Sequence, residues 1–288
     1  NGGKPVFVDI ELDRLTIDVI SVANAISDKT KAIIPVHLYG QMCDMHALRS
    51  IADHHGLHII EDAAHCIEGT RDGIKPGQLG DTACFSFYAT KNLTCGEGGA
   101  VITNDPELAD RLRLLRSHGM TKTAADRERD GYSHWDMVLF GWKYNMDNIH
   151  AALLLPQLEG INERWNNRVA VADRYRRALE ELTEVTLPSV VGNSKHAFHL
   201  YPIRVKKTLR DQIIQTFNQN GIGSTVNYQA VHLLSFFSKT LNHSLGDFPH
   251  AEQIGDTTIS IPFYPSIPDS HVDTVIETIK SGLVKSNA

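Results

Sequence analysis

The sequence lacks the features that would point to a membrane or a nucleic acid. None of its apolar runs approaches the about 20 residues that a membrane-spanning helix needs. No signal peptide is visible, and the net charge of -6 gives no basic footprint for nucleic acid. We therefore expect a cytoplasmic protein that spans no membrane and binds no nucleic acid.

Cysteine is scarce, and the histidines do not gather into a metal site. The four cysteines form no C-x-x-C pair, so we expect free thiols in a reducing compartment. Histidine is plentiful, but its densest group, His54, His55 and His58, spans the end of a helical pattern and the start of a strand. These side chains do not share one helix face, so no metal site is expected.

Two short apolar runs organise the chain, and both end on polar residues. The run 57–60 is followed by Asp62, and the run 84–88, which contains Ser86, is followed by Lys91 and a glycine-rich turn. In an open α/β sheet, ligands bind beyond the carboxyl ends of the strands. One acid, one hydroxyl and one amine are therefore expected to converge on one crevice.

This trio suits pyridoxal phosphate, which needs a lysine for its Schiff base and polar groups around its phosphate. An acid beside the pyridine nitrogen keeps that nitrogen protonated, because an opposite charge favours the charged form. Taken singly, each residue has a simpler explanation: Lys91 as a surface lysine, Asp62 as a helix N-cap and Ser86 as a partner of the backbone. Their joint spacing favours the cofactor.

The same region resembles a known family over a long, gap-free stretch. The matching text is EDAAHCIEG at 61–69 and GQLGDTACFSFYATKNLTCGEGGAVITND at 77–105. It is similar to the signature of the DegT/StrS sugar aminotransferases, which are fold-type I pyridoxal phosphate enzymes. Within that family it most resembles the branch that makes 4-amino sugars on nucleotide carriers. The resemblance implies Lys91 as the catalytic lysine, with cofactor contacts from Asp62, Ala64, His65 and Ser86.

Two further phrases resemble the family in the second half of the chain. In GWKYNMD, at 141–147, Lys143 and Asn145 stand where the commoner family form has Asn and Arg, as in the aminoarabinose-type branch. This loop is implied to cross a dimer interface, so a homodimer and cofactor contacts from Lys143 and Asn145 are expected. For Lys143 alone, a solvated surface lysine is the alternative. The second phrase, near 223–232, implies substrate contacts from Tyr228 and His232.

The alternation of strand and helix patterns predicts an α/β fold with a mainly parallel sheet. With the resemblance, we expect a three-layer α/β/α large domain at 1–165 that binds the cofactor and a smaller C-terminal α/β domain at 166–288. Strands are expected at 5–9 and 30–36, and a long helix after Asp147 is expected to break at Pro156.

The chain resembles roughly the last three-quarters of a family member. The family segment that precedes the matching text carries a phosphate-binding turn and an aromatic residue that stacks on the pyridine ring. Because this segment is expected to be absent before Asn1, the chain as given is expected to bind the cofactor more weakly than a longer relative.

The resemblance implies transfer of an amino group from an amino acid donor, glutamate, to a nucleotide-linked keto sugar. One alternative is a sugar dehydratase of the same fold, but that branch has histidine in place of the lysine. A second alternative is a truncated, non-catalytic module that only dimerises. A nicotinamide-dependent dehydrogenase lacks support, since no strand is followed by G-x-G-x-x-G.

Overall fold

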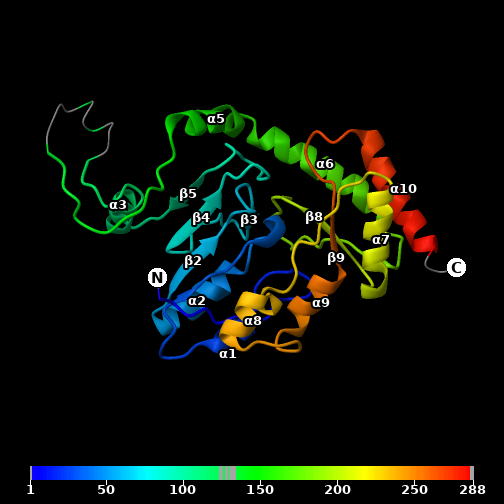
Figure 1. Cartoon of the computed structure of the whole chain (residues 1–288), viewed down its shortest axis with the longest axis horizontal. Coiled ribbons are helices and arrows are strands. Elements are labelled where there is room, and N and C mark those ends of the chain that lie inside the picture. Colours follow the sequence, from blue (N-terminus) through cyan, green and yellow to red (C-terminus); the bar gives the residue numbers. More distant parts are fainter. Residues whose placement is uncertain (1, 123–125, 127–128, 130–133, 286–288) are drawn as a thin grey trace.

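The first half of the chain is built around a four-stranded central sheet (Figure 1). The computed structural model describes residues 2–122, 126, 129 and 134–285. The strand order is β1-β2-β4-β5, and the strands are β1 (Ala32–Ile33), β2 (His58–Asp62), β4 (Thr82–Ser86) and β5 (Gly99–Ile102). β1, β2 and β4 are parallel, whereas β5 is antiparallel to β4. The expected α/β fold with a mainly parallel sheet is therefore confirmed.

Two of the expected strands differ from the prediction. Residues 5–9 form no strand, and only an isolated bridge between Ile10 and Ile17 follows them. Within the segment 30–36, the continuous ladder with β2 is limited to Ala32 and Ile33, because Pro35 has no N–H to donate to it. The chain rejoins the sheet through a single bridge between Val36 and Asp62.

Two helices cover one face of this sheet. α1 (Val19–Ala25) is capped by Asp18, and α2 (Met45–His55) is capped by Asp44, whose side chain accepts from Ala47 N at 3.0 Å. α2 ends at Gly56 in the left-handed conformation, which glycine adopts without steric cost. The buried residues of this layer are Val22, Ile33, Met42, Cys43, Met45, Leu48, Ala52, Leu57, Ile59, Cys66 and Ala197.

The opposite face of the sheet exposes apolar side chains. Residues in register on neighbouring strands share a face, and here Ile34, Ile60 and Val101 are 60%, 36% and 48% exposed. In the described part of the chain no helix buries them, so the second layer of the expected three-layer arrangement is not seen over these strands. α3 (Pro106–Leu115), capped by Asp105, likewise has no buried residue.

The long helical stretch after Asp147 breaks at a glycine and not at the expected proline. Asp147 caps α5 (Asn148–Glu159), and α6 (Ile161–Leu179) starts after Gly160. Pro156 lies inside α5, which continues beyond it to Glu159. Residue 165 lies within the unbroken α6, and the predicted domain boundary there remains a prediction.

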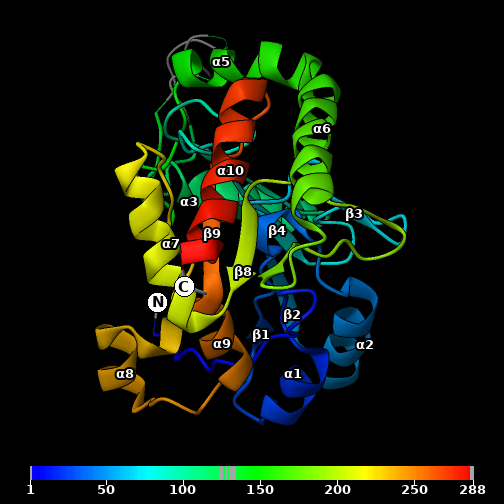
Figure 2. The ribbon, with the colours of Figure 1, turned by 90° about the vertical axis from the view of Figure 1, so that its right-hand side faces the viewer.

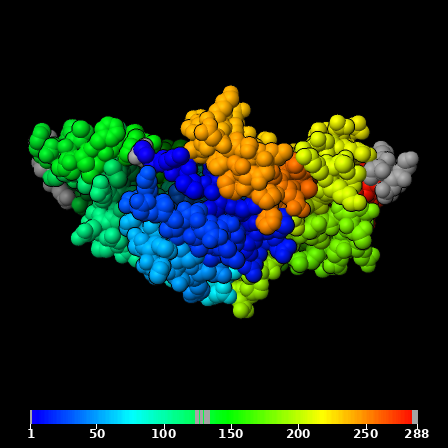
Figure 3. Space-filling view, turned by 90° about the horizontal axis from the view of Figure 1, so that it is seen from below, coloured from blue at the N-terminus to red at the C-terminus, as the bar shows by residue number. Residues whose placement is uncertain are grey.

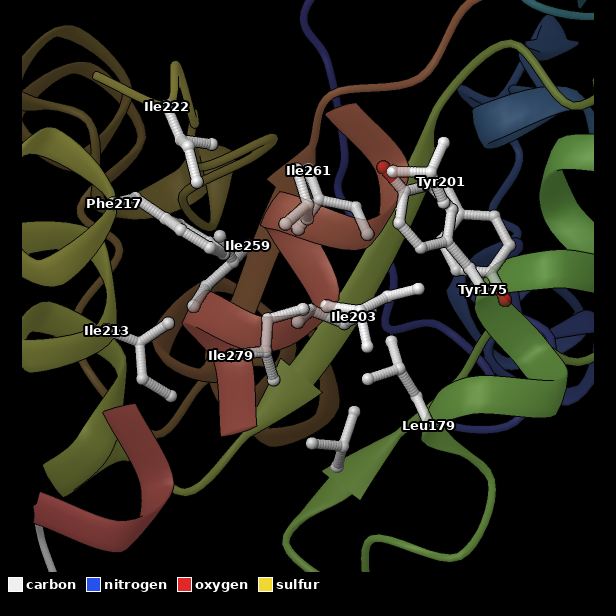
Figure 4. Close-up of a cluster of buried hydrophobic side chains, with 14 of the residues drawn as sticks. Tyr175, Leu179, Tyr201, Ile203, Ile213, Phe217, Ile222, Ile259, Ile261 and Ile279 are labelled. Carbon is white, nitrogen blue, oxygen red and sulfur yellow. The ribbon is translucent and has the colours of Figure 1, made fainter. Parts of the chain in front are cut away.

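The C-terminal part has its own sheet and core. β6 (Val185–Thr186), β8 (Tyr201–Val205) and β9 (Thr258–Ile261) form an antiparallel sheet against α7 (Lys207–Gln219) and α10 (Asp269–Lys285). α6 and α10 lie side by side in Figure 2. Figure 4 shows the apolar cluster between them, where Tyr175 and Leu179 of α6 meet Tyr201 and Ile203 of β8. The smaller C-terminal α/β unit thus has the expected elements.

Short elements connect the two halves. β3 (Thr70–Arg71) pairs with β7 (Ser194–Lys195), and two 3-10 turns, η1 (Leu38–Gly40) and η2 (Val231–Leu233), lie in loops. α8 (Ser235–Leu241) and α9 (Pro249–Thr257) pack on the N-terminal segment, as Figure 3 shows from below. There Asp9 accepts from the N–H groups of His250 and Ala251 at 3.0 and 2.9 Å, in the first turn of α9. Among the described helices, none is long and apolar enough to cross a membrane.

Candidate active site

Asp62 lies at the carboxyl end of β2 with one side-chain oxygen already used. Its Oδ1 accepts from the N–H of Ala64 at 3.0 Å, which fixes the carboxylate against the turn after the strand. Among the residues that the structure describes, no group donates a hydrogen bond to Oδ2. This oxygen is therefore available to a cationic N–H from a ligand.

Ser86, at the end of β4, lies on the same face of the sheet as Asp62. Its Oγ accepts from the N–H of Tyr88 at 3.3 Å, so its own hydrogen remains available for donation. A depression of about 320 Å³ covers this face, within the about 300–1,000 Å³ of small-molecule sites. The residues that line it are Ile34, Ile60, Glu61, Asp62, Ala64, Cys84, Phe85 and Ser86.

Lys91 follows β4 in a turn that its own backbone closes. Its N–H donates to the carbonyl oxygen of Tyr88 at 2.9 Å. The side chain is half-buried, and burial lowers the pKa of its amine, while the nearby Asp62 carboxylate opposes that shift. Partial burial of this kind favours the uncharged, nucleophilic form of a lysine.

His65 is held as a neutral ring close to Lys91. The backbone N–H of Tyr39 donates to its Nδ1 at 3.3 Å, so the ring proton is on Nε2. Burial, followed by the positive charge of Lys91, lowers the pKa of His65 to about 4. The ring of Tyr228 lies nearly parallel to it at 6.3 Å. His65 therefore offers an N–H donor and not a base.

The residues present fit pyridoxal phosphate in their chemistry. The free Oδ2 of Asp62 suits a protonated pyridine nitrogen, the hydroxyl of Ser86 suits a phosphate oxygen, and Lys91 supplies the amine. All three come from the ends of neighbouring strands. Asp62 and Ser86 line the same depression, whereas Lys91 is not among its lining residues and is linked to Asp62 by their electrostatic interaction. The convergence of all three groups on one crevice remains a prediction.

Lys143 and Asn145 do not line this depression. Both are exposed, and Lys143 Nζ donates to Oδ1 of Asn145. The backbone of Lys143 forms a bridge with Ser117, beyond α3. Within one chain the structure does not bring these two residues to Asp62, and their contact with a cofactor remains a prediction.

The two predicted substrate contacts differ in their surroundings. Tyr228 is half-exposed beside His65. Burial, followed by the negative charge of Asp62, raises the pKa of its hydroxyl. His232 is only 2% exposed, and its Nε2 lies 2.9 Å from Oε1 of Glu252. The geometry therefore favours Tyr228 over His232, although both assignments remain predictions. Among the described residues, no group of three or more His, Cys, Asp or Glu side chains could hold a metal.

His199 and Asn92, which the sequence patterns did not indicate, complete the surroundings of Lys91. The ring of His199 lies 4.2 Å from that of His65, and its Nδ1 lies 3.2 Å from Oδ1 of Asn92. Asn92 directly follows Lys91, which was the one available signal. His199 is 107 residues further along the chain, so no local pattern could place it here.

Comparison with known proteins agrees with this geometry. Residues 1–280 match the DegT/DnrJ/EryC1/StrS aminotransferase family. The chain is 39% identical over 285 residues to SpsC, a spore coat polysaccharide biosynthesis protein of Bacillus subtilis (strain 168), with 97% of this chain and 73% of SpsC covered.

Two solved structures show the same fold at substantial identity. DesV of S. venezuelae, in complex with a ketimine intermediate, has a TM-score of 0.86 and 35% identity, over 96% of this chain and 71% of DesV. The PLP-form of Spr1654 from Streptococcus pneumoniae has a TM-score of 0.90 and 30% identity, over 99% of this chain and 76% of Spr1654. The narrower resemblance to the aminoarabinose-type branch remains a prediction. The protein is thus an enzyme of the DegT/DnrJ/EryC1/StrS aminotransferase family.

Proposed function

We propose that this enzyme is a pyridoxal phosphate-dependent sugar aminotransferase that moves an amino group from glutamate to a nucleotide-linked keto sugar. The observation that carries the proposal is the interaction between the Lys91 amine and the Asp62 carboxylate, which is close enough to affect the pKa of that amine. Asp62 ends β2, and Lys91 follows the neighbouring strand β4. The PLP-form of Spr1654 and the polysaccharide role in the name of SpsC support the cofactor and the sugar.

When bound, pyridoxal phosphate supplies an electron sink for the carbon that carries the amino group. The chain supplies the proton transfers and the orientation. Lys91 would hold the cofactor through its Nζ, and the amino group of the donor would displace it. The freed amine of Lys91, whose pKa burial lowers, would then take a proton from the donor carbon and give it up once the amino group has been transferred.

Three other groups orient the reactants. Asp62 Oδ2 would accept the pyridine N–H, and its negative charge would keep the ring protonated. His65, whose Nδ1 is taken by Tyr39, would offer its Nε2–H as a donor to an oxygen of the cofactor or substrate. The hydroxyl of Ser86 would donate to the phosphate.

We further propose a homodimer in which Lys143 and Asn145 reach the partner's cofactor phosphate. The support is their exposure and their distance from this chain's own depression, which they do not line. A lysine serves such a phosphate as a point charge.

The experiment is an isotope transfer with 15N-labelled glutamate and a nucleotide-linked 4-keto hexose. The proposal predicts a nucleotide-linked amino sugar that carries the label, together with 2-oxoglutarate, in mass spectra. A sugar that loses water and gains no nitrogen would instead identify the dehydratase. No conversion, with pyridoxal phosphate present and the fold intact, would favour the non-catalytic module.

A further inference from the structure

A buried ion pair lies behind the turn that carries Lys91 and takes no part in the reaction proposed above. Arg168, on α6, donates from Nη2 to Oε1 of Glu68, and these residues are 2% and 8% exposed. Arg168 also donates from Nε to the carbonyl oxygen of Ala197 at 3.3 Å. Loss of either partner would leave an uncompensated buried charge, so each side chain holds the other in place.

The ion pair fixes the orientation of the amide of Asn92, the residue after Lys91. Asn92 Nδ2 lies 3.0 Å from Glu68 Oε2 and 3.1 Å from the carbonyl oxygen of Ala197. Both partners can only accept hydrogen bonds, so the NH2 group must face them. The other end of the amide, Oδ1, is then an obligatory acceptor that faces His199.

The orientation of Asn92 decides which nitrogen of His199 carries the proton. Nδ1 of His199 lies 3.2 Å from Asn92 Oδ1 and must donate to it. Burial, followed by the electrostatic effects of His65, Lys91 and Arg168, lowers the pKa of His199 to about 2, so the ring is neutral. His199 therefore carries its proton on Nδ1 and leaves Nε2 bare, the reverse of His65.

His199 and His65 are tied to each other through one backbone segment. The N–H of His199 donates to the carbonyl oxygen of Tyr39 at 2.9 Å, and the N–H of Tyr39 donates to Nδ1 of His65 at 3.3 Å. The two imidazole rings lie 4.2 Å apart. Gly40 is required here, because a Cβ on it would lie 2.8 Å from the backbone N of Phe198.

We propose that Arg168, Glu68 and Asn92 are positioning residues that fix His199 as the Nδ1–H tautomer and so hold the His65 ring beside Lys91. The inference rests on the proposed roles of Lys91 and His65. It makes α6, from the C-terminal part of the chain, a support for the Lys91 turn. Without the Asn92 acceptor, the Nδ1–H of His199 loses its partner and the ring is free to turn away from His65.

The test reads the tautomers directly by 15N NMR of histidine-labelled protein, with and without pyridoxal phosphate. In the unaltered chain, we expect His199 protonated at Nδ1 and His65 at Nε2. Asn92→Leu should move His199 toward the Nε2–H form, because it removes the acceptor of the Nδ1–H group. Arg168→Gln should mix the two tautomers, and Arg174→Gln, at a partly exposed ion-pair residue on the same helix, should leave them unchanged.

His196 serves as an internal control for folding, because its Nδ1 accepts from Phe198 N at 2.9 Å and its signal should stay constant. In turnover, Asn92→Leu should lower kcat on the order of 10²-fold with KM for glutamate little changed, as expected for a misplaced group. Nε2–H at His199 in the unaltered chain, or unchanged tautomers in folded Asn92→Leu, would overturn the inference. Because the tautomers are read without cofactor, that result is independent of the proposed function.

Discussion

At the scale of single residues, two adjacent carboxylates in β2 have opposite surroundings. Asp62 faces the open depression, and one of its oxygens is available to a ligand. Glu61 points to the other face, where it is fully buried and paired with His37. Successive side chains of a strand point to opposite faces of the sheet, which places the two carboxylates in different surroundings. Asp62 can therefore face a ligand while Glu61, next to it in the sequence, makes its hydrogen bonds within the protein.

We predict that Asp62→Asn nearly abolishes amino transfer while the fold is retained. The neutral amide cannot keep the pyridine nitrogen protonated, so the electron sink is lost. A fall in kcat on the order of 10²-fold or more is expected in steady-state kinetics, as for removal of one preorganised electrostatic group. Glu97→Gln, at an exposed position, is the matched control and should stay near normal. Near-normal turnover of Asp62→Asn with cofactor bound would refute this role.

At the scale of elements, Glu61 joins three segments. Its Oε1 accepts from the N–H groups of Gly77 and Gly80 at 3.0 and 2.7 Å, and its Oε2 lies 2.8 Å from His37 Nε2. His37 Nδ1 in turn accepts from Cys43 N at 3.2 Å. β2, the loop before β4 and the loop before α2 are thus held at one carboxylate.

Glu61→Gln should destabilise the fold by about 1–3 kcal/mol, the cost of a buried polar group left without a partner. If the new amide keeps its bonds to the two glycines through its oxygen, its NH2 group faces the Nε2–H of His37. If His37 changes tautomer to avoid this, its Nδ1–H faces the N–H of Cys43. Urea unfolding at pH 7 measures the loss, and an effect as small as that of Glu97→Gln would contradict the account.

Two buried histidines, His196 and His199, should make the fold less stable in mild acid. Burial, followed by the charge of Arg176, lowers the pKa of His196 to about 3, and burial lowers the pKa of His199 to about 2. In the unfolded chain these two histidines take up protons near pH 6.5, whereas in the folded protein they do so only at much lower pH. The free energy of unfolding is therefore highest above pH 6.5 and falls as the pH falls below that value. Between pH 7 and pH 5 each buried histidine should cost about 2 kcal/mol.

Urea unfolding at pH 7 and pH 5 tests this. His196→Gln should reduce the difference between the two pH values by about 2 kcal/mol, the share of one histidine. The exposed His54→Gln should leave the difference unchanged. The same pH dependence in all three proteins would show that the buried ring takes up its proton without unfolding.

At the scale of the whole molecule, contacts close in sequence were predictable and distant ones were not. The caps Asp44 and Asp105, and the proximity of Asp62 to Lys91 at one sheet edge, follow from local patterns and strand ends. The hydrogen bond from Asn92 to Ala197 spans 105 residues and depends on how the two halves pack. The break at Gly160 was missed because α5 continues for three residues past Pro156, and α6 then starts after a glycine that has no capping side chain.

Several apolar side chains near the Lys143 loop are exposed. Phe140, Tyr144 and Ile149 are largely exposed there, as suits a protein interface more than a free surface. We predict a homodimer in which this loop completes the partner's site. Mixing Lys91→Ala with Lys143→Ala should restore activity that neither variant has alone, since a mixed dimer contains one complete site. A monomer in sedimentation, with tight cofactor binding, would contradict this arrangement.

The measurement that tests the central claim most directly is borohydride trapping of the chain with pyridoxal phosphate, followed by peptide mass spectrometry. The amine of Lys91 is half-buried, its pKa is lowered by burial, and the Asp62 carboxylate lies within its electrostatic reach. The account predicts one dominant modified peptide, carrying the reduced cofactor on Lys91, and its loss in Lys91→Ala but not in Lys29→Ala, which changes an exposed lysine of the N-terminal part. Cofactor trapped mainly on another lysine would contradict the account.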